Sequence, residues 1–338
     1  MGWLAIDIGG ANIKLADGQG FAQSHYFPLW QKPNKLEQEL RTLIVQSPPC
    51  DRIAATMTGE LADCFATKEA GVRHIIDAFV AASDGRHARI YRLDGKIVTP
   101  QVALDQPMQC AASNWHALAR FASRFASRFA SRGNALLVDI GSTTCDLVWL
   151  ENGQPHTQGL TDTDRLLSGE LVYTGVARSP LCAVASSIPY RGRLCPLAHE
   201  VFANMLDVYL TLGDLPEEPT NNVTADGRPA TREYALARLA RAICTDTTQF
   251  TDKDATAAAN AVAQEQLELL SSALEFVLAQ REARPSTVIT SGLGEFLVPR
   301  MLSTVGLECS TFSLGTQLGP RASRCATAHA LAVLASEA

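Results

Sequence analysis

Residues 5–15 read AIDIGGANIKL, and residues 137–147 read LVDIGSTTCDL. Each stretch begins as an apolar strand, reaches an aspartate, passes through a tight turn of small residues and continues as a second strand. One such turn is also typical of an ordinary hairpin. Two of them, about 130 residues apart, predict two related lobes that face a shared phosphate and metal site.

The first turn carries the residue types that hold a metal-bound phosphate. Asp7 stands at a strand end, where it can bind Mg²⁺ directly or through water. Gly9 and Gly10 allow positive φ and let backbone N–H groups approach an anion. Asn12 and Lys14 alternate on the next strand, so both side chains lie on one face and can point toward a phosphate. We predict that Asp7 and Lys14 are catalytic and that the other three bind the phosphate ligand.

The second turn repeats this chemistry with hydroxyl groups. Asp139 offers a second carboxylate, so we predict that it is catalytic and that Asp7 and Asp139 are the metal ligands. Asp146 falls at the strand position that Lys14 has in the first turn. The predicted phosphate-binding residues of this turn are Gly141, Ser142, Thr143, Thr144 and Asp146.

A third glycine turn follows the apolar stretch 287–290 and precedes a predicted helix. The N-terminus of a helix can bind an anion, and glycines let the backbone pack against a flat ring. We therefore predict that Ser291, Gly292 and Gly294 belong to the ligand site.

Length, composition and net charge are typical of a soluble globular protein. Its 338 residues suffice for about two domains, and 46 % of them are apolar. The net charge of −6 argues against a nucleic-acid partner, and no apolar run is long enough to predict a membrane span. The nine scattered cysteines and the absence of a signal-peptide pattern predict reduced thiols and a cytoplasmic protein. A homo-oligomer stays open.

We place the lobe boundary after a long predicted helix, residues 109–132, which gives lobes of residues 1–133 and 134–338. We expect the last helix to pack back on the first lobe. The long helix contains Phe-Ala-Ser-Arg three times, from Phe121 to Arg132. Phenylalanines at i, i+4 and i+8 favour a buried ridge, and the arginines leave a basic docking face as the alternative. A further helix is predicted over residues 198–212.

The ordered set of three turns resembles the superfamily of sugar kinases, Hsp70 and actin. This resemblance implies two ribonuclease-H-like α/β lobes with an interlobe cleft. Residues 5–14 are also similar to the start of a hydantoinase/oxoprolinase-related family tied to tetrahydromethanopterin-linked one-carbon transfer. Four other stretches carry the same resemblance, namely residues 56–63 (TMTGELAD), 112–115 (ASNW), 168–175 (SGELVYTG) and 225–228 (ADGR).

The family resemblance implies a transferase of methanofuran biosynthesis. Archaeal members join a γ-glutamyl-tyramine phenol to an aminomethylfuran-methyl diphosphate and release pyrophosphate. The expected ligands are therefore small diphosphate-bearing molecules with Mg²⁺. ATP is the alternative ligand, although Ala11 stands where such turns usually carry a hydroxyl residue. Two other functions remain as hypotheses: an ATP-dependent small-molecule kinase or ATPase, and a non-catalytic nucleotide-binding regulatory module.

A phenol has a pKa of about 10 and is protonated at neutral pH, so its attack needs a base. Glu60 is the predicted catalytic base, with Asp63 and Glu170 as other candidates. Four arginines in predicted loops are candidates for clamping a phosphate or the glutamyl carboxylate: Arg178, Arg191, Arg193 and Arg228.

Overall fold

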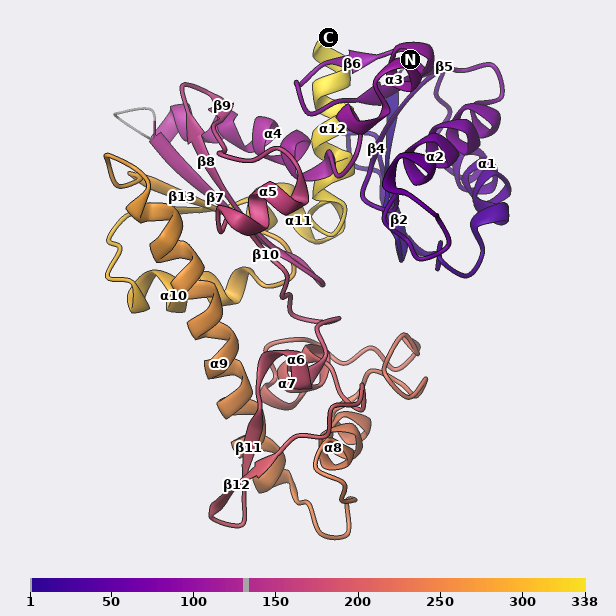
Figure 1. The fold of residues 1–338 in the computed structure, drawn as a ribbon. Helices are drawn as coiled ribbons and strands as arrows, with labels where there is room; N and C mark the ends of the chain where they lie inside the picture. The colour runs from indigo at the N-terminus through magenta and orange to yellow at the C-terminus, as the bar shows by residue number, and fades with distance from the viewer. Residues whose placement is uncertain (1, 130–133) are drawn as a thin grey trace.

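Two α/β lobes lie side by side, and a smaller insert extends below the second lobe in Figure 1. The structure is a computed structural model that describes residues 2–129 and 134–338, with the backbone alone for residues 127–129. Within these two ranges, no helix is long and apolar enough to cross a membrane.

The first lobe is built around a six-stranded sheet in the order β3-β2-β1-β4-β5-β6. β1 pairs antiparallel with β2 and parallel with β4, so Asp7 lies opposite Lys14 on one side and Thr56 on the other. Helices α1 and α2 bury their apolar faces against one side of this sheet. The elements are β1 (Trp3–Ile8), β2 (Asn12–Ala16), β3 (Ala22–Tyr26), η1 (Pro33–Lys35), α1 (Leu36–Gln46), β4 (Arg52–Met57), α2 (Lys68–Ser83), β5 (His87–Tyr91), β6 (Ile97–Val98), α3 (Pro100–Asp105), η2 (Pro107–Gln109) and α4 (Asn114–Phe129).

The second lobe repeats the strand order of the first. Its sheet runs β10-β8-β7-β13-β14, with the short β9 beside β8, and again the first strand pairs antiparallel with the second and parallel with the fourth. Asp139 therefore lies opposite Asp146 and Ser291. The prediction of two ribonuclease-H-like α/β lobes is confirmed. The elements are β7 (Asn134–Ile140), β8 (Cys145–Glu151), β9 (Gln154–Pro155), α5 (Asp162–Leu167), β10 (Leu171–Val172), β13 (Thr287–Ser291), η3 (Glu295–Leu297), α10 (Val298–Thr304), β14 (Ser310–Ser313), α11 (Leu314–Ser323) and α12 (Ala326–Glu337).

An insert, residues 173–251, separates β10 from the long helix α9. Tyr209 and Leu239 of the insert belong to the same buried cluster as Leu136 and Trp149 of the second sheet, so insert and lobe share one core. Helix α9 joins them, running from the insert up to the second lobe (Figure 1). The elements are α6 (Leu181–Val184), β11 (Ser187–Tyr190), β12 (Arg193–Pro196), α7 (Met205–Leu212), α8 (Arg232–Arg241) and α9 (Asp252–Ala279).

Each sheet is covered on one face by a helix from the other half of the chain. The last helix, α12, packs on β1, β2 and β4, where Leu331 meets Ala5 and Ala54 of the first sheet. Helix α4 packs on β7, β8 and β13 of the second sheet, and the two helices contact each other. The boundary between residues 133 and 134 stays a prediction, but this exchange ties the two lobes together.

The Phe-Ala-Ser-Arg repeat forms interior contacts, as its spacing indicates. Phe121 packs against Phe125 and His329, and Phe125 stacks on Phe312. The third copy lies outside the described side chains. Helix α4 begins at Asn114 rather than at residue 109, because the 3₁₀ turn η2 and the positive φ of Ala112 precede it.

The helix predicted over residues 198–212 begins only at Met205. Asp207 caps the helix there: its Oδ2 accepts a hydrogen bond from the Asn204 N–H at 2.9 Å, and its own N–H donates to the Asn204 carbonyl at 2.9 Å. The apolar pattern gave no sign of this helix start, so the first half of the predicted helix is wrong.

We predict that the protein loses stability as the pH falls below 6.5. The Tyr91 hydroxyl lies 2.8 Å from Nδ1 of His116, a buried contact between β5 and α4, and burial lowers the pKa of His116 from 6.5 to about 4. The unfolded state therefore takes up this proton first. The free energy of unfolding should fall by about 3 kcal/mol between these two pH values, and this contribution should be constant above them.

Denaturant unfolding between about pH 7.5 and pH 4 checks this prediction. His116→Asn is the matched variant, because the amide retains a hydrogen-bond acceptor and does not titrate. The variant should lose less stability over the acid range than the wild type. An equal loss in both proteins would contradict the assignment to His116.

Candidate active site

The two aspartate turns are built by the same backbone hydrogen bond. The Gly9 N–H donates to the Asn12 carbonyl at 3.0 Å, and the Gly141 N–H donates to the Thr144 carbonyl at 2.8 Å. Both turns lie at the carboxyl ends of the first strands of their sheets, β1 and β7. In open α/β sheets this is the edge at which ligands bind.

Asp7 is buried at the first turn with half of its carboxylate unpaired. Its Oδ2 accepts a hydrogen bond from Thr327 of α12, while Oδ1 has no partner. Lys14 lies opposite it on β2 and is partly exposed. A buried carboxylate oxygen without a hydrogen bond is costly, so this atom is suited to a metal ion or a metal-bound water.

Asp139 lies among charges from both lobes. Burial and the neighbouring charge of Asp146 raise the pKa of Asp139 to about 7, opposed by the Ser291 hydrogen bond and by the positive charge of Lys14. Because Lys14 belongs to the first lobe, its effect on Asp139 means that the two turns lie within electrostatic reach of each other. Asp146 is itself paired with the buried Arg165, at 2.9 Å between Oδ1 and Nη2.

The third glycine turn packs directly on the second. Gly292 has a φ of +90°, and a Cβ there would lie 2.3 Å from the carbonyl oxygen of Ile140 and 2.7 Å from Oδ1 of Asp139. The Gly294 N–H donates to the same carbonyl at 2.8 Å. Glycine is therefore required at residue 292 both by the backbone conformation and by the close approach. The structure brings Ser291, Gly292 and Gly294 to Asp139.

Glu60 lies beside the first turn in a loop that packs on Gly9. The N–H groups of Thr58 and Gly59 both donate to the Ile8 carbonyl, at 3.0 and 3.1 Å. Glu60 is 1 % exposed, its Oε2 has no partner, and burial raises the pKa of its carboxyl above the ordinary value.

Lys68 joins Glu60 to the second lobe. Its Nζ lies 3.6 Å from Oε1 of Glu60 and 3.2 Å from Oδ2 of Asp162 at the start of α5. The sequence reasoning missed Lys68, which is the first residue of α2 and offered no motif of its own.

The residues present fit Mg²⁺ held by few protein ligands. The described residues contain no cluster of three or more His, Cys, Asp or Glu side chains placed to bind a metal. Mg²⁺ usually binds through one or two carboxylates plus substrate phosphates and water. The unpaired Oδ1 of Asp7 offers such a ligand, and Asp139 is the second one that we propose.

The other two candidates for the base, Glu170 and Asp63, are less suited to that role. Both oxygens of the Glu170 carboxylate already accept hydrogen bonds, so neither is free to accept a proton from a substrate. The donors are the N–H groups of Gln158 and Gly159 and the side chains of Ser168 and Arg281. Asp63 is exposed in the loop after Glu60. Glu60 is therefore the candidate that combines burial with an unpaired oxygen.

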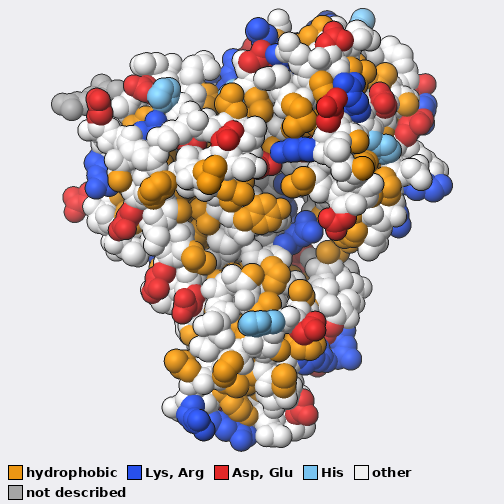
Figure 2. Space-filling view, viewed as in Figure 1, with side chains coloured by type: hydrophobic (Ala, Val, Ile, Leu, Met, Phe, Trp, Pro, Cys, Tyr) orange, Lys and Arg blue, Asp and Glu red, His pale blue; other side chains and the backbone are white. Residues whose placement is uncertain are grey.

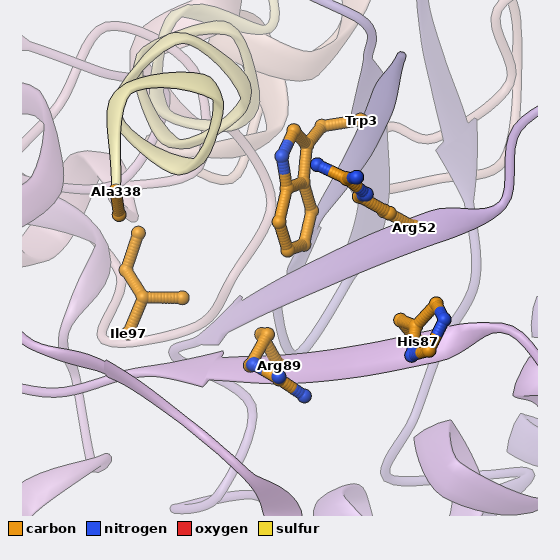
Figure 3. Close-up of a pocket in the computed structure, with 6 residues that line it drawn as sticks. All are labelled: Trp3, Arg52, His87, Arg89, Ile97 and Ala338. Carbon is orange, nitrogen blue, oxygen red and sulfur yellow. The ribbon is translucent and has the colours of Figure 1, made fainter. Parts of the chain in front are cut away.

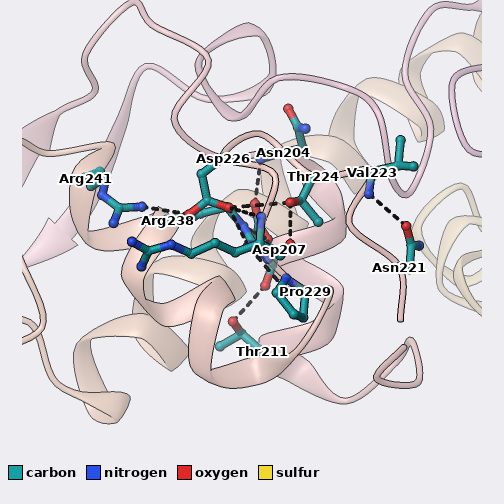
Figure 4. A network of polar contacts seen from close by, with 11 residues as sticks. Asn204, Asp207, Thr211, Asn221, Val223, Thr224, Asp226, Pro229, Arg238 and Arg241 are labelled. Atoms are coloured by element: carbon teal, nitrogen blue, oxygen red, sulfur yellow. Dashed lines mark hydrogen bonds and ion pairs between the residues drawn. The ribbon is translucent and has the colours of Figure 1, made fainter. Parts of the chain in front are cut away.

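The stretch ADGR, residues 225–228, takes part in an ion-pair network within the insert. Figure 4 shows Asp226 between Arg238 and Arg241, and Oδ1 and Oδ2 lie 3.0 and 2.9 Å from the two guanidinium groups. Arg238 is fully buried and also pairs with Asp207 at 2.7 Å. This network fixes the loop before α8, so the motif is accounted for by packing within the insert.

The four candidate arginines lie in different places. Arg178 is held at the second turn, where its N–H donates to the Ser142 carbonyl at 2.7 Å. Arg191 and Arg193 lie on the β11–β12 hairpin of the insert, and Arg228 lies over the ring of Tyr234. Arg178 is thus the one directly bonded to a predicted phosphate turn.

A cavity of about 340 Å³ lies at the opposite edge of the first sheet. Figure 3 shows Trp3, Arg52 and His87 around it, and these are the first residues of β1, β4 and β5. The carboxyl ends of the same strands carry the first turn and Glu60. This cavity is therefore separate from the candidate active site.

Comparisons with known proteins agree with this arrangement. Residues 51–337 match the family model described as hydantoinase/oxoprolinase. A relative in Methanocaldococcus jannaschii is 35 % identical over 295 residues, which cover 86 % of each chain. A relative in Methanococcus vannielii is 29 % identical over 205 residues, 60 % of this chain and 90 % of that one. Both are named as synthases of a (furan-2-yl)methanamine that bears a γ-L-glutamylaminoethyl-phenoxymethyl group.

Solved structures share the fold at low sequence identity. Nucleotide-free acetone carboxylase aligns with a TM-score of 0.54 at 11 % identity, over 98 % of this chain and 70 % of that one. A PilM–PilN type IV pilus biogenesis complex aligns with a TM-score of 0.51 at 13 % identity, over 98 % of both chains. At such identities the likeness shows the fold alone.

We predict that Asp7→Asn and Asp139→Asn each weaken Mg²⁺-dependent pyrophosphate binding by about tenfold or more, because each removes one carboxylate from the shared site. Calorimetry at about pH 8 measures this with Asp139 ionised. Asp84→Asn is the control, since Asp84 is exposed at the end of α2 with a φ of +52° that asparagine adopts readily. Unchanged binding in both site variants would rule out the shared-metal arrangement.

Proposed function

Because the chain belongs to the hydantoinase/oxoprolinase family, we propose that it joins the phenol of γ-glutamyl-tyramine to aminomethylfuran-methyl diphosphate and releases pyrophosphate. The relatives' names describe the ether that this reaction forms. The observation that carries the proposal is the charge of Lys14, which acts on Asp139 across the lobes and supports a single phosphate site formed by both turns.

The residues of the two turns suit a leaving diphosphate. The carbon–oxygen bond to the diphosphate breaks, and pyrophosphate leaves with the bonding electron pair. Lys14 and the backbone amides of both turns stabilise the negative charge that develops on it. When bound, Mg²⁺ adds Lewis-acid stabilisation of the same oxygens. Ala11 leaves this turn without the hydroxyl contact of related turns, which favours a diphosphate substrate over ATP.

Glu60 is the base that we assign to the phenol. The phenol oxygen forms the new bond to the furanylmethyl carbon, and its proton passes to the Glu60 carboxylate. A carboxyl with a raised pKa is a stronger base than an exposed one, and its unpaired Oε2 can accept the proton. The positive charge of Lys68, 3.6 Å away, opposes part of the rise in the pKa of Glu60 that burial causes.

A kinase or ATPase is the second candidate function. The third turn favours it, because Gly292 brings a flat stretch of backbone against Asp139 at the place where the superfamily resemblance implies an adenosine site. The assay below therefore includes ATP with a hydroxyl acceptor.

We predict that the purified protein releases pyrophosphate and forms the ether from the two substrates only when Mg²⁺ is present. Pyrophosphate is measured with a coupled assay and the ether by mass spectrometry. ATP consumption with a hydroxyl acceptor, without ether formation, would replace the transferase by the kinase. Nucleotide binding without any turnover would favour the regulatory module.

We further predict that Glu60→Gln lowers kcat by about 100-fold or more, because general-base assistance typically contributes about 10²–10⁴-fold. In the wild type, kcat/KM should fall on the acid side at a pH above the ordinary carboxyl pKa, since the base must be ionised and burial raises its pKa. The variant should lack this acid limb. Glu69→Gln is the control, because Glu69 is exposed on α2 and pairs with Arg73. An intact acid limb in Glu60→Gln would assign the base elsewhere.

A further inference from the structure

Arg178, at the start of the insert, meets Trp30 of the first lobe. Arg178 is anchored to the second turn through its own N–H and through the N–H of Ala177, which donate to the Ser142 carbonyl at 2.7 and 3.1 Å. Trp30 is anchored to the first turn, because the preceding Leu29 donates its N–H to the Gly10 carbonyl at 2.9 Å. The Arg178 guanidinium lies 5.8 Å from the centre of the Trp30 ring.

This contact is as wide as those of Arg52 with Trp3 and Arg281 with Trp149, at 5.9 and 5.5 Å. It is much wider than the arginine–tryptophan contact between α5 and α4. There, the Arg165 guanidinium lies 3.9 Å from the centre of the Trp115 ring, and both side chains are buried. Arg178 is exposed, and Trp30 is partly exposed. The Arg178–Trp30 pair is thus open to solvent and is not part of the packed core.

Arg178 takes part in no ion pair among the residues that the structure describes. Within residues 2–129 and 134–338, no carboxylate lies at ion-pair distance from its guanidinium, in a protein whose net charge is −6. Figure 2 shows Lys or Arg side chains in the hollow where the two lobes and the insert meet. The backbone of Arg178 is fixed to the turn that carries the Ser142 and Thr143 hydroxyls, and a guanidinium group is suited to bind a phosphate.

The Trp30 face offers the second half of a binding site. A flat ring between a guanidinium and an indole needs about 3.5 Å on each side, or about 7 Å in total. The present separation of 5.8 Å would have to widen by only about 1 Å. A small relative movement of the lobes would therefore admit an aromatic ring between the two groups.

We propose that Arg178 and Trp30 recognise a flat ring joined to a diphosphate: the ring stacks between the indole and the guanidinium, and N–H groups at the edge of the guanidinium donate to the diphosphate. This inference rests on the proposed function and deepens it, because it assigns the donor substrate's two parts to named side chains. Both residues are specificity determinants, since one reads the diphosphate and the other reads the ring.

The test compares two ligands on the same variants. Inorganic pyrophosphate has no ring, and aminomethylfuran-methyl diphosphate has one. Calorimetry with Mg²⁺ should show that Arg178→Ala weakens both ligands by about tenfold or more. Trp30→Ala should weaken the ring-bearing ligand by about tenfold and leave pyrophosphate within about twofold, while Trp30→Phe restores most of the loss. Quenching of Trp30 fluorescence by the ring-bearing ligand gives a second readout that does not depend on turnover.

Arg284→Ala is the matched control, because Arg284 is exposed before the first residue of β13, at the end of the strand opposite the turns, and the change removes the same charge. Equal effects of Arg178→Ala and Arg284→Ala would overturn the assignment of Arg178. Unchanged binding of the ring-bearing ligand to Trp30→Ala would overturn the assignment of Trp30, with the proposed function intact. If ADP shows the Trp30-dependent gain and the furan ligand does not bind, the ring–diphosphate site stands and the proposed function fails.

Discussion

The exchange of helices α4 and α12 is the constraint on which the site depends. The last helix covers the first sheet, and Thr327 in its first turn donates a hydrogen bond to Asp7. The helix that ends the first half of the chain covers the second sheet instead. Because the two helices also contact each other, the lobes are joined through buried surfaces behind the strands, and the turns at the strand ends are left free to face a ligand.

The two turns differ in charge. The first pairs Asp7 with Lys14 across the strands, whereas the second pairs Asp139 with Asp146 and obtains its cation from Arg165. Lys14 thus remains available to a ligand, while Arg165 is buried against Trp115. The first lobe supplies the positive charge of Lys14, and the second supplies the hydroxyl groups of its turn. Together these groups suit a diphosphate.

Much of the fold could be predicted from the sequence, because its decisive signals are local. The turns at Asp7 and Asp139 are determined by glycines and small residues within a few positions. These turns, with the apolar strands before them, predict both sheets. Contacts between distant segments had no such signal. Thr327 lies in an alanine-rich helix 320 residues from Asp7, and nothing in the sequence placed Trp30 beside Arg178. The stretch ADGR resembles a family pattern, yet Asp226 pairs with Arg238 inside the insert.

The central claim is that one diphosphate binds to both turns at once. A crystal structure of the protein with Mg²⁺ and pyrophosphate tests it most directly. We expect pyrophosphate between the Gly9–Gly10 turn and the Ser142–Thr144 turn, with Mg²⁺ on Asp7 or Asp139 and Lys14 on a phosphate oxygen. Pyrophosphate bound to one lobe alone, or in the cavity beside Trp3 and Arg52, would contradict it.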